Sequence, residues 1–134
     1  MDKLQLVRNF SARILTGKRK FDHITRSLNN LGWLNVKDTL LYQDAIMMFK
    51  SINGMVPSYL SSKLIKRNSE IHNCVTRQAN DLNILRCRTK TATRSFVYPA
   101  SQLWNSFDTY VRNLNLGNFK KNAKEELLRN RNKK

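Results

Sequence analysis

The core of this 134-residue chain is expected in the stretch Leu40-Leu41-Tyr42-Gln43-Asp44-Ala45-Ile46-Met47-Met48-Phe49-Lys50-Ser51-Ile52-Asn53-Gly54. Its apolar residues cover most of a helical wheel, which is the pattern of a helix that packs on several sides. Asn53 and Gly54 are residues that end helices. The sequence therefore predicts a core helix over residues 36–53.

A second strong helical signal precedes this stretch, over residues 3–16, and ends at Gly17. Arg8 and Arg13 fall on the polar side of this predicted helix, which we expect to be solvated. Its apolar side is expected to be buried and consists of Leu4, Val7, Phe10 and Ile14.

A shorter helix is predicted between these two. Asp22 is a favourable N-cap, and Ile24, Leu28 and Leu31 follow at helical spacing before a stop at Gly32.

The remainder of the chain has weaker signals. Pro57 favours a short helical turn through residue 65. Beyond it the helical rhythm disappears, and residues 82–89 and 94–98 are predicted to be short strands. Helices are then expected over residues 99–107 and 117–129.

The predicted fold class is accordingly mainly α: a compact helical domain with a small β-hairpin-like element between the helical halves. We expect a single basic domain that comprises a helical half (1–65), a connection with short strands (66–98), C-terminal helices (99–130) and a basic tail (131–134).

Charge is the most informative feature of the composition. Lys and Arg total 25 and Asp and Glu total 9, so the formal net charge is +16. Such a field attracts polyanions, and RNA or DNA is the expected partner, through its phosphates. A membrane surface would also attract this charge, but no helix has the expected separation of basic and bulky apolar faces, so no membrane partner is predicted.

The expected location is intracellular, in the nucleus or the cytoplasm. The longest apolar run, Ala45 to Phe49, is far shorter than the roughly 20 residues that cross a bilayer, and the segment Met1-Asp2-Lys3-Leu4 begins no signal-like region. Two cysteines are too few for a secreted disulfide scaffold.

The sharpest polar pattern lies within the predicted strands. Arg86, Arg88, Lys90 and Arg94 share parity and would line one face of an extended segment, because strand side chains alternate. Such a row of cations can follow a phosphate backbone. The alternative is an edge strand whose charges only prevent edge-to-edge pairing.

Two further basic clusters are candidates for phosphate contacts, because loops present several cations together. Solvated loop charge is the alternative for both, and the first also resembles a minimal nuclear-import signal. The first cluster is Lys18, Arg19 and Lys20, and the second is Lys63, Lys66 and Arg67.

No metal site is predicted. His72, Cys74 and Cys87 fall short of the four ligands in paired short spacings that structural zinc needs, and His23 lies in the other half of the chain.

No catalytic site or cofactor is predicted either, because the chain has no adjacent acidic pair, no Gly-rich phosphate loop and no Gly-x-Ser-x-Gly. Trp33 and Trp104 lie within apolar helical patterns, which favours core packing over base stacking.

Four motifs are specific when taken together: Gly17-Lys18-Arg19-Lys20-Phe21-Asp22-His23-Ile24-Thr25, Leu31-Gly32-Trp33-Leu34-Asn35-Val36, Val56-Pro57-Ser58-Tyr59-Leu60 and Leu103-Trp104-Asn105-Ser106. In order and spacing they resemble the C-terminal region of non-LTR retrotransposon reverse transcriptases of the jockey-like and related animal classes. Arg26 and Asn35 depart from that pattern, since the family often has proline at both positions. The aromatic-x-Asp-Asp metal site of the polymerase is absent.

The resemblance implies a non-catalytic accessory module that helps to hold template RNA or target DNA during target-primed reverse transcription. It implies a polymerase domain in trans as a second partner, and an origin as a truncated reading frame. The alternatives are a protein docking module whose first helix leaves an apolar face open, and a functionless fragment of a decayed element.

Overall fold

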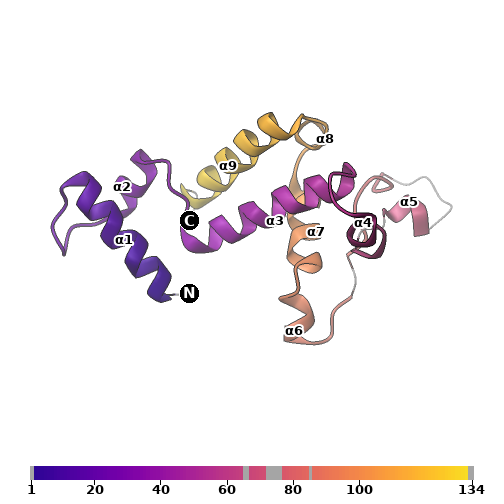
Figure 1. Cartoon of the computed structure of the whole chain (residues 1–134), viewed down its shortest axis with the longest axis horizontal. Helices are drawn as coiled ribbons and strands as arrows, with labels where there is room; N and C mark the ends of the chain where they lie inside the picture. Colours follow the sequence, from indigo (N-terminus) through magenta and orange to yellow (C-terminus); the bar gives the residue numbers. More distant parts are fainter. Residues whose placement is uncertain (1, 65–66, 72–76, 85, 133–134) are drawn as a thin grey trace. The chain divides into compact units, whose positions relative to one another are not determined.

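Nine helices make up the regular structure of residues 2–64, 67–71, 77–84 and 86–132, which are the residues that the computed structural model describes (Figure 1). The mainly helical fold class predicted from the sequence is confirmed. The helices are α1 (Asp2–Thr16), α2 (Thr25–Asn30), α3 (Val36–Ile52), α4 (Ser58–Leu64), α5 (Asn68–Ile71), α6 (Lys90–Thr93), α7 (Val97–Ser106), α8 (Thr109–Arg112) and α9 (Leu116–Asn132).

The chain folds as two compact units. Residues 1–42 and 122–134 form the first unit, and residues 43–121 form the second. The boundaries fall inside α3 and inside α9, so each of these helices contributes residues to both units.

The core helix predicted from the central stretch forms as α3. The side-chain oxygen of Asn35 accepts a hydrogen bond of 2.6 Å from the backbone N–H of Asp38, which caps the first turn. At the other end Gly54 has a φ of +67°, and the N–H of Met55 donates to the carbonyl of Lys50. A left-handed residue at this position is the reason why glycine ends the helix.

The core of the second unit is a cluster of four aromatic rings, of which the fully buried Phe119 contacts the other three. The ring of Phe119 stacks on that of Phe49 with centroids 4.5 Å apart, and meets that of Phe107 edge-on at 5.5 Å. The indole of Trp104 is tilted against it at 5.9 Å. These rings come from α3, α9 and α7 with its C-cap, so the cluster holds three chain segments together. Trp104 is a core residue, as the sequence predicted.

A polar clamp orders the irregular chain around this core. The side-chain amide of Asn105 donates to the carbonyl of Leu82 and accepts from its N–H, each at 2.9 Å, and so pairs with Leu82 as a strand neighbour would. The guanidinium of Arg112 donates to the carboxylate of Asp81 and to the backbone carbonyls of Phe107 and Asn105.

The prediction of short strands over residues 82–89 and 94–98 is wrong. The only strand-like pairing among the described residues is an isolated bridge between Arg67 and Leu82. The side chain of Asn105 forms hydrogen bonds with the backbone of Leu82, which a neighbouring strand would otherwise form. Further along, the hydroxyl of Thr89 accepts a hydrogen bond from the N–H of Ala92. Thr89 therefore caps a helical turn, α6, where the sequence indicated an extended chain.

The first helix has the predicted bounds but the opposite orientation. Of its apolar residues only Ala12 enters the core of the first unit, where it packs with Ile24 and Leu28. The side chain of Gln5 accepts from the N–H of Val36, and the guanidinium of Arg8 donates to the hydroxyl of Thr39.

These contacts place the polar side of α1 against its own unit, so the prediction of a buried apolar face and a solvated polar face is wrong. The apolar side chains that are exposed instead are Leu4, Leu6, Val7, Phe10, Ile14 and Leu15.

The turn before α2 also differs from its prediction. The carboxylate of Asp22 accepts a hydrogen bond of 2.8 Å from the N–H of Arg19 and so closes the preceding loop. It does not cap a helix, because α2 begins at Thr25 with Ile24 as its N-cap.

We predict that Arg112→Ala lowers the free energy of unfolding by about 2–3 kcal/mol, because the change leaves a carboxylate and two carbonyls without a charged donor. Its side chain is only 13% exposed. Urea titration followed by circular dichroism measures the change. Arg112→Lys should recover only part of the loss, since one ammonium does not span three acceptors in the plane of a guanidinium. A loss no larger than that of the exposed Arg77→Ala would contradict the clamp.

Arg8→Gln should also destabilise the protein, by about 1 kcal/mol. The guanidinium donates to Thr39 at 2.7 Å and lies 5.9 Å from the ring centroid of Trp33, so the change removes a hydrogen bond and a cation–π contact. The comparison is Arg26→Gln on the exposed side of α2 in the same unit, which we expect to change the urea midpoint little. Equal midpoints for the two variants would show that Arg8 does not anchor α1.

Candidate nucleic-acid interface

The cations predicted to contact phosphates are exposed wherever their side chains are described. The one ion pair of the described part of the chain joins Arg112 to Asp81, so none of the cations whose side chains are described forms an ion pair with an acid. The side chain of Lys63 and the whole of Lys66 lie outside the described residues. The exposed members of the set are Lys18, Arg19, Lys20, Arg67, Arg86, Arg88, Lys90 and Arg94.

Four of these cations cluster around α6 in the second unit. Arg86 and Arg88 precede the helix in irregular chain, Lys90 is its first residue, and Arg94 is its C-cap. Because residues four apart lie on the same side of a helical turn, Lys90 and Arg94 share one side. The four cations therefore do not line one face of a strand, as predicted. Lys90 and Arg94 lie on one side of a helical turn, and Arg86 and Arg88 precede that turn.

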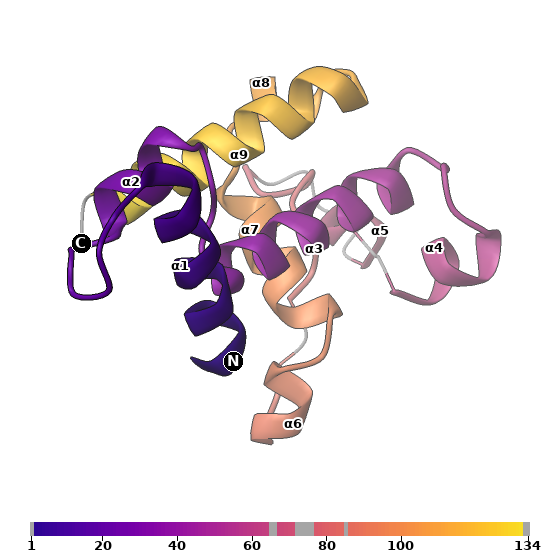
Figure 2. The same cartoon turned by 60° about the vertical axis from the view of Figure 1, so that its left-hand side comes forward.

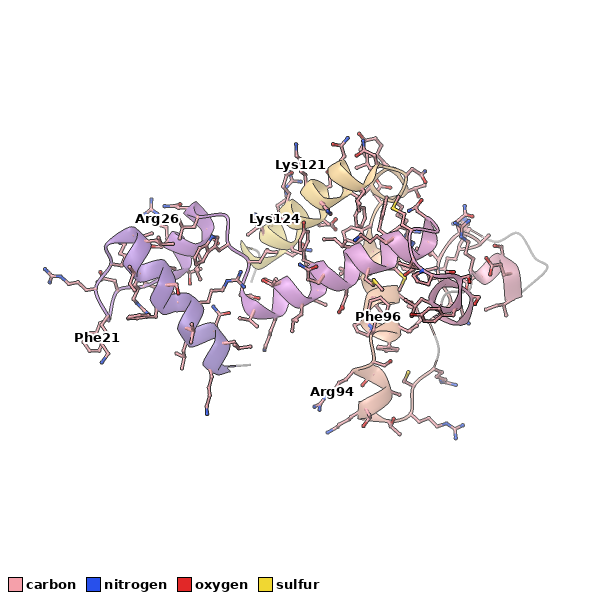
Figure 3. All side chains as sticks on the ribbon, viewed as in Figure 1. Phe21, Arg26, Arg94, Phe96, Lys121 and Lys124 are labelled. Atoms are coloured by element: carbon pink, nitrogen blue, oxygen red, sulfur yellow. The ribbon has the colours of Figure 1, made fainter. Side chains whose placement is uncertain are left out.

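The surroundings of α6 favour contact with an anion. No acidic residue occurs between positions 82 and 107, so no carboxylate of this segment opposes the four cations. Both Figure 1 and Figure 2 show α6 projecting from the start of α7, and Arg94 points away from the ribbon in Figure 3. The segment presents its charge at a protruding end of its unit.

The basic loop of the first unit lies between α1 and α2. Gly17 ends α1 with a φ of +63°, and the carboxylate of Asp22 closes the loop on the N–H of Arg19. This turn leaves three successive cationic side chains in solvent.

Phe21 is a candidate binding residue that the sequence did not single out. Its side chain is 92% exposed, and the ammonium of Lys20 lies 5.7 Å from its ring centroid (Figure 3). An aromatic ring beside cations offers a surface on which a base can stack. The sequence signal for its exposure is its place between the basic run of residues 18–20 and the turn residue Asp22.

The predicted cluster of Lys63, Lys66 and Arg67 is less suited to binding a phosphate. Arg67 is exposed but lines a small hollow of about 270 Å³ together with Ser61, Ser62 and Glu70. The carboxylate of Glu70 would repel a phosphate there.

No group of three or more His, Cys, Asp or Glu side chains that would suit a metal ion occurs within the described ranges. Of the residues weighed as zinc ligands, His72 and Cys74 lie outside those ranges, and Cys87 is half-buried.

Burial raises the pKa of Asp44, and it raises the pKa of Glu126 against the opposing effect of Arg129.

Comparison of the chain with protein-family models, curated proteins and solved structures finds no match. In the part of the chain that is described, no helix is long and apolar enough to cross a membrane. The candidate interface therefore stands on the charges and geometry set out above.

Proposed function

We propose that this protein is a non-catalytic module that binds RNA or DNA through contacts to phosphates. The observation that supports the proposal most is the set of seven exposed cations around α6 and in the loop between α1 and α2, none of which forms an ion pair in the described part of a chain of net charge +16. Releasing the counterions of a nucleic acid is the main source of affinity for such a surface.

The cations around α6 are proposed as the principal contact, and the basic loop with Phe21 as a second one. Phosphate contacts position a protein on a nucleic acid without reading its sequence. The α6 cations are suited to phosphate contacts, so we expect affinity without sequence preference. The exposed ring of Phe21 adds a means of holding unpaired bases, which favours single strands at the loop.

The resemblance to the C-terminal region of retrotransposon reverse transcriptases supports a nucleic-acid role from a separate direction. We also propose that the chain originates from such an element and acts together with a polymerase domain on a separate chain. Sequencing of the genomic frame upstream of Met1 tests this origin. A polymerase domain encoded in that frame would support it.

Replacing the four α6 cations by glutamine (Arg86→Gln, Arg88→Gln, Lys90→Gln, Arg94→Gln) should weaken binding at every sequence alike. Each phosphate contact adds about −0.9 to the slope of log affinity against log salt on duplex DNA, so the slope should fall in magnitude by roughly 3 to 4. Fluorescence anisotropy over a salt series measures it. If the charges only protect an exposed segment, the variant will keep its affinity and aggregate instead.

The matched control removes four other exposed cations: Arg26, Lys37, Lys121 and Lys124. Arg8 and Arg13, whose polar face the sequence suggested to be solvated, are unsuitable as a control because Arg8 anchors α1 and the Nε of Arg13 is buried. The control should change the slope less than the α6 variant. An equal change would mean that the charge acts as a diffuse cloud and that α6 is not the site.

Phe21→Ala should lower the affinity for single-stranded RNA or DNA by about tenfold and leave duplex binding unchanged, since stacking on one base is worth about 1–3 kcal/mol. The salt slope should stay the same because no cation is lost. Tyr110→Ala, which removes an aromatic ring that is 70% exposed in the second unit, serves as the control. Equal losses on single strands and duplexes would exclude stacking by Phe21.

A further inference from the structure

The outward side of α1 is an apolar surface. Six large side chains of this helix are each 63–66% exposed, although most helices of soluble proteins turn such residues inward. A contiguous apolar patch on a folded surface marks a place of interaction. We define this face as Leu4, Leu6, Val7, Phe10, Ile14 and Leu15.

The orientation of this face is determined by contacts on the opposite side of α1. Gln5 accepts from the N–H of Val36, Arg8 donates to Thr39, and Ala12 is buried against Ile24 and Leu28. Turning the apolar face inward would break both hydrogen bonds and remove Ala12 from its packing. The face therefore points away from the core of the first unit.

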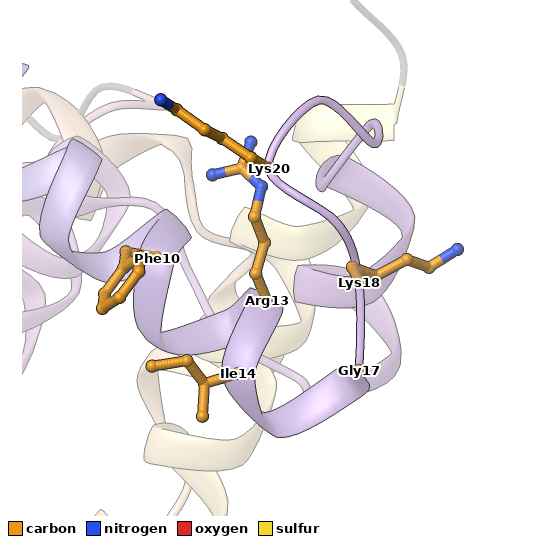
Figure 4. A pocket seen from close by; sticks show the side chains of 6 residues that line it. All are labelled: Phe10, Arg13, Ile14, Gly17, Lys18 and Lys20. Carbon is orange, nitrogen blue, oxygen red and sulfur yellow. The ribbon is translucent and has the colours of Figure 1, made fainter.

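One end of the face is hollowed. A hollow of about 460 Å³ is lined by the apolar side chains of Phe10 and Ile14 and also by Arg13, Lys18 and Lys20. In Figure 4 the side chain of Lys18 points away from Phe10 and Ile14. The backbone of Gly17 completes the hollow, and apart from Gly17 itself and the adjoining chain no atom lies within 4 Å of the place where a β-carbon would stand. An apolar side chain that enters here would be flanked by cations.

Charge indicates which occupant fits. Between residues 3 and 20 the chain has six cations and no acid. In a two-fold pair of copies the same surface patch would meet itself, so cations would face cations in a chain that already has a net charge of +16. A lipid bilayer offers anionic headgroups but a flat surface, which leaves the hollow unfilled.

We infer that the apolar face of α1 docks an acidic amphipathic helix of a partner protein. The apolar residues of that helix would lie along Val7, Phe10 and Ile14, and one of them would enter the hollow. Its flanking carboxylates would pair with Arg13, Lys18 and Lys20, as charge-assisted hydrogen bonds favour. A helix of about 15 residues matches the length of α1, and helix-in-groove recognition uses anchors at i, i+3, i+4 and i+7.

The test uses two synthetic helical peptides of about that length, with leucine at the anchor positions and either glutamate or lysine at every flanking position. Fluorescence anisotropy with the full chain should show saturable binding of the glutamate peptide, and at least tenfold weaker binding of the lysine peptide. Equal binding of the two peptides, or no binding of the glutamate peptide, would overturn the proposal.

Variants locate the site. The double change Val7→Gln and Ile14→Gln should weaken the glutamate peptide at least tenfold, yet leave the urea midpoint and nucleic-acid binding unchanged, because both side chains are exposed. The control, Tyr59→Gln with Tyr110→Gln, removes similarly exposed apolar surface from the second unit and should leave peptide binding intact. Lys18→Glu with Lys20→Glu should reduce the preference for the glutamate peptide.

Two further measurements separate the other occupants. Vesicles of phosphatidylcholine with phosphatidylserine should bind the double variant of Val7 and Ile14 as well as the original chain, since only phosphate attraction acts there. Sedimentation should likewise show the same oligomeric state for both. A loss of vesicle binding in the double variant would assign the face to a membrane surface, and a loss of self-association would assign it to a second copy. Either result would overturn the proposal.

Discussion

The contact between the stacked rings of Phe49 and Phe119 is the one on which the second unit depends. The two rings lie 4.5 Å apart at an interplanar angle of 30°, and Trp104 and Phe107 enclose Phe119 on further sides. Aromatic pairs contribute beyond the area they bury, and their geometry restricts how the segments that supply them can pack. Because the cluster holds α7 against α3 and α9, it also determines where α6 projects with its cations. The proposed phosphate contact is thus positioned by an apolar core in which it has no part.

The first unit is held together differently. One buried apolar cluster of this unit consists of Ala12, Ile24 and Leu28, with Leu31 and Trp33 packed against it. Polar contacts from Gln5 and Arg8 fix the orientation of α1, so that its apolar residues point toward solvent. The two proposed interactions therefore depend on different properties of the surface. Nucleic-acid binding depends mainly on unpaired charge, whereas the docking of a partner helix needs, besides the cations of the hollow, apolar surface that the unit does not bury.

Part of the candidate site followed from the sequence. The identity of the exposed cations was predicted, since long charged side chains without neighbouring acids stay in solvent. Their arrangement was not, because the shared parity of Arg86, Arg88, Lys90 and Arg94 has meaning only on a strand. Asn105, 23 residues beyond Leu82, satisfies the backbone groups on which a strand at that position would have depended. Phe21 was missed because its exposure arises from the loop that Asp22 closes.

The sequence by itself determined where the longest helices run, that the chain is strongly basic, and that α1 and α3 end at glycines. These are local properties: apolar spacing, the positive φ of Gly17 and Gly54, and the charge of side chains. Only the tertiary structure decided which side of α1 is turned inward and that residues 90–93 are helical. Periodicity shows which residues share a face, but the choice of the buried face depends on partners distant in sequence. For α1 those partners are the N–H of Val36 and the hydroxyl of Thr39, each 31 residues away, and they bind polar side chains.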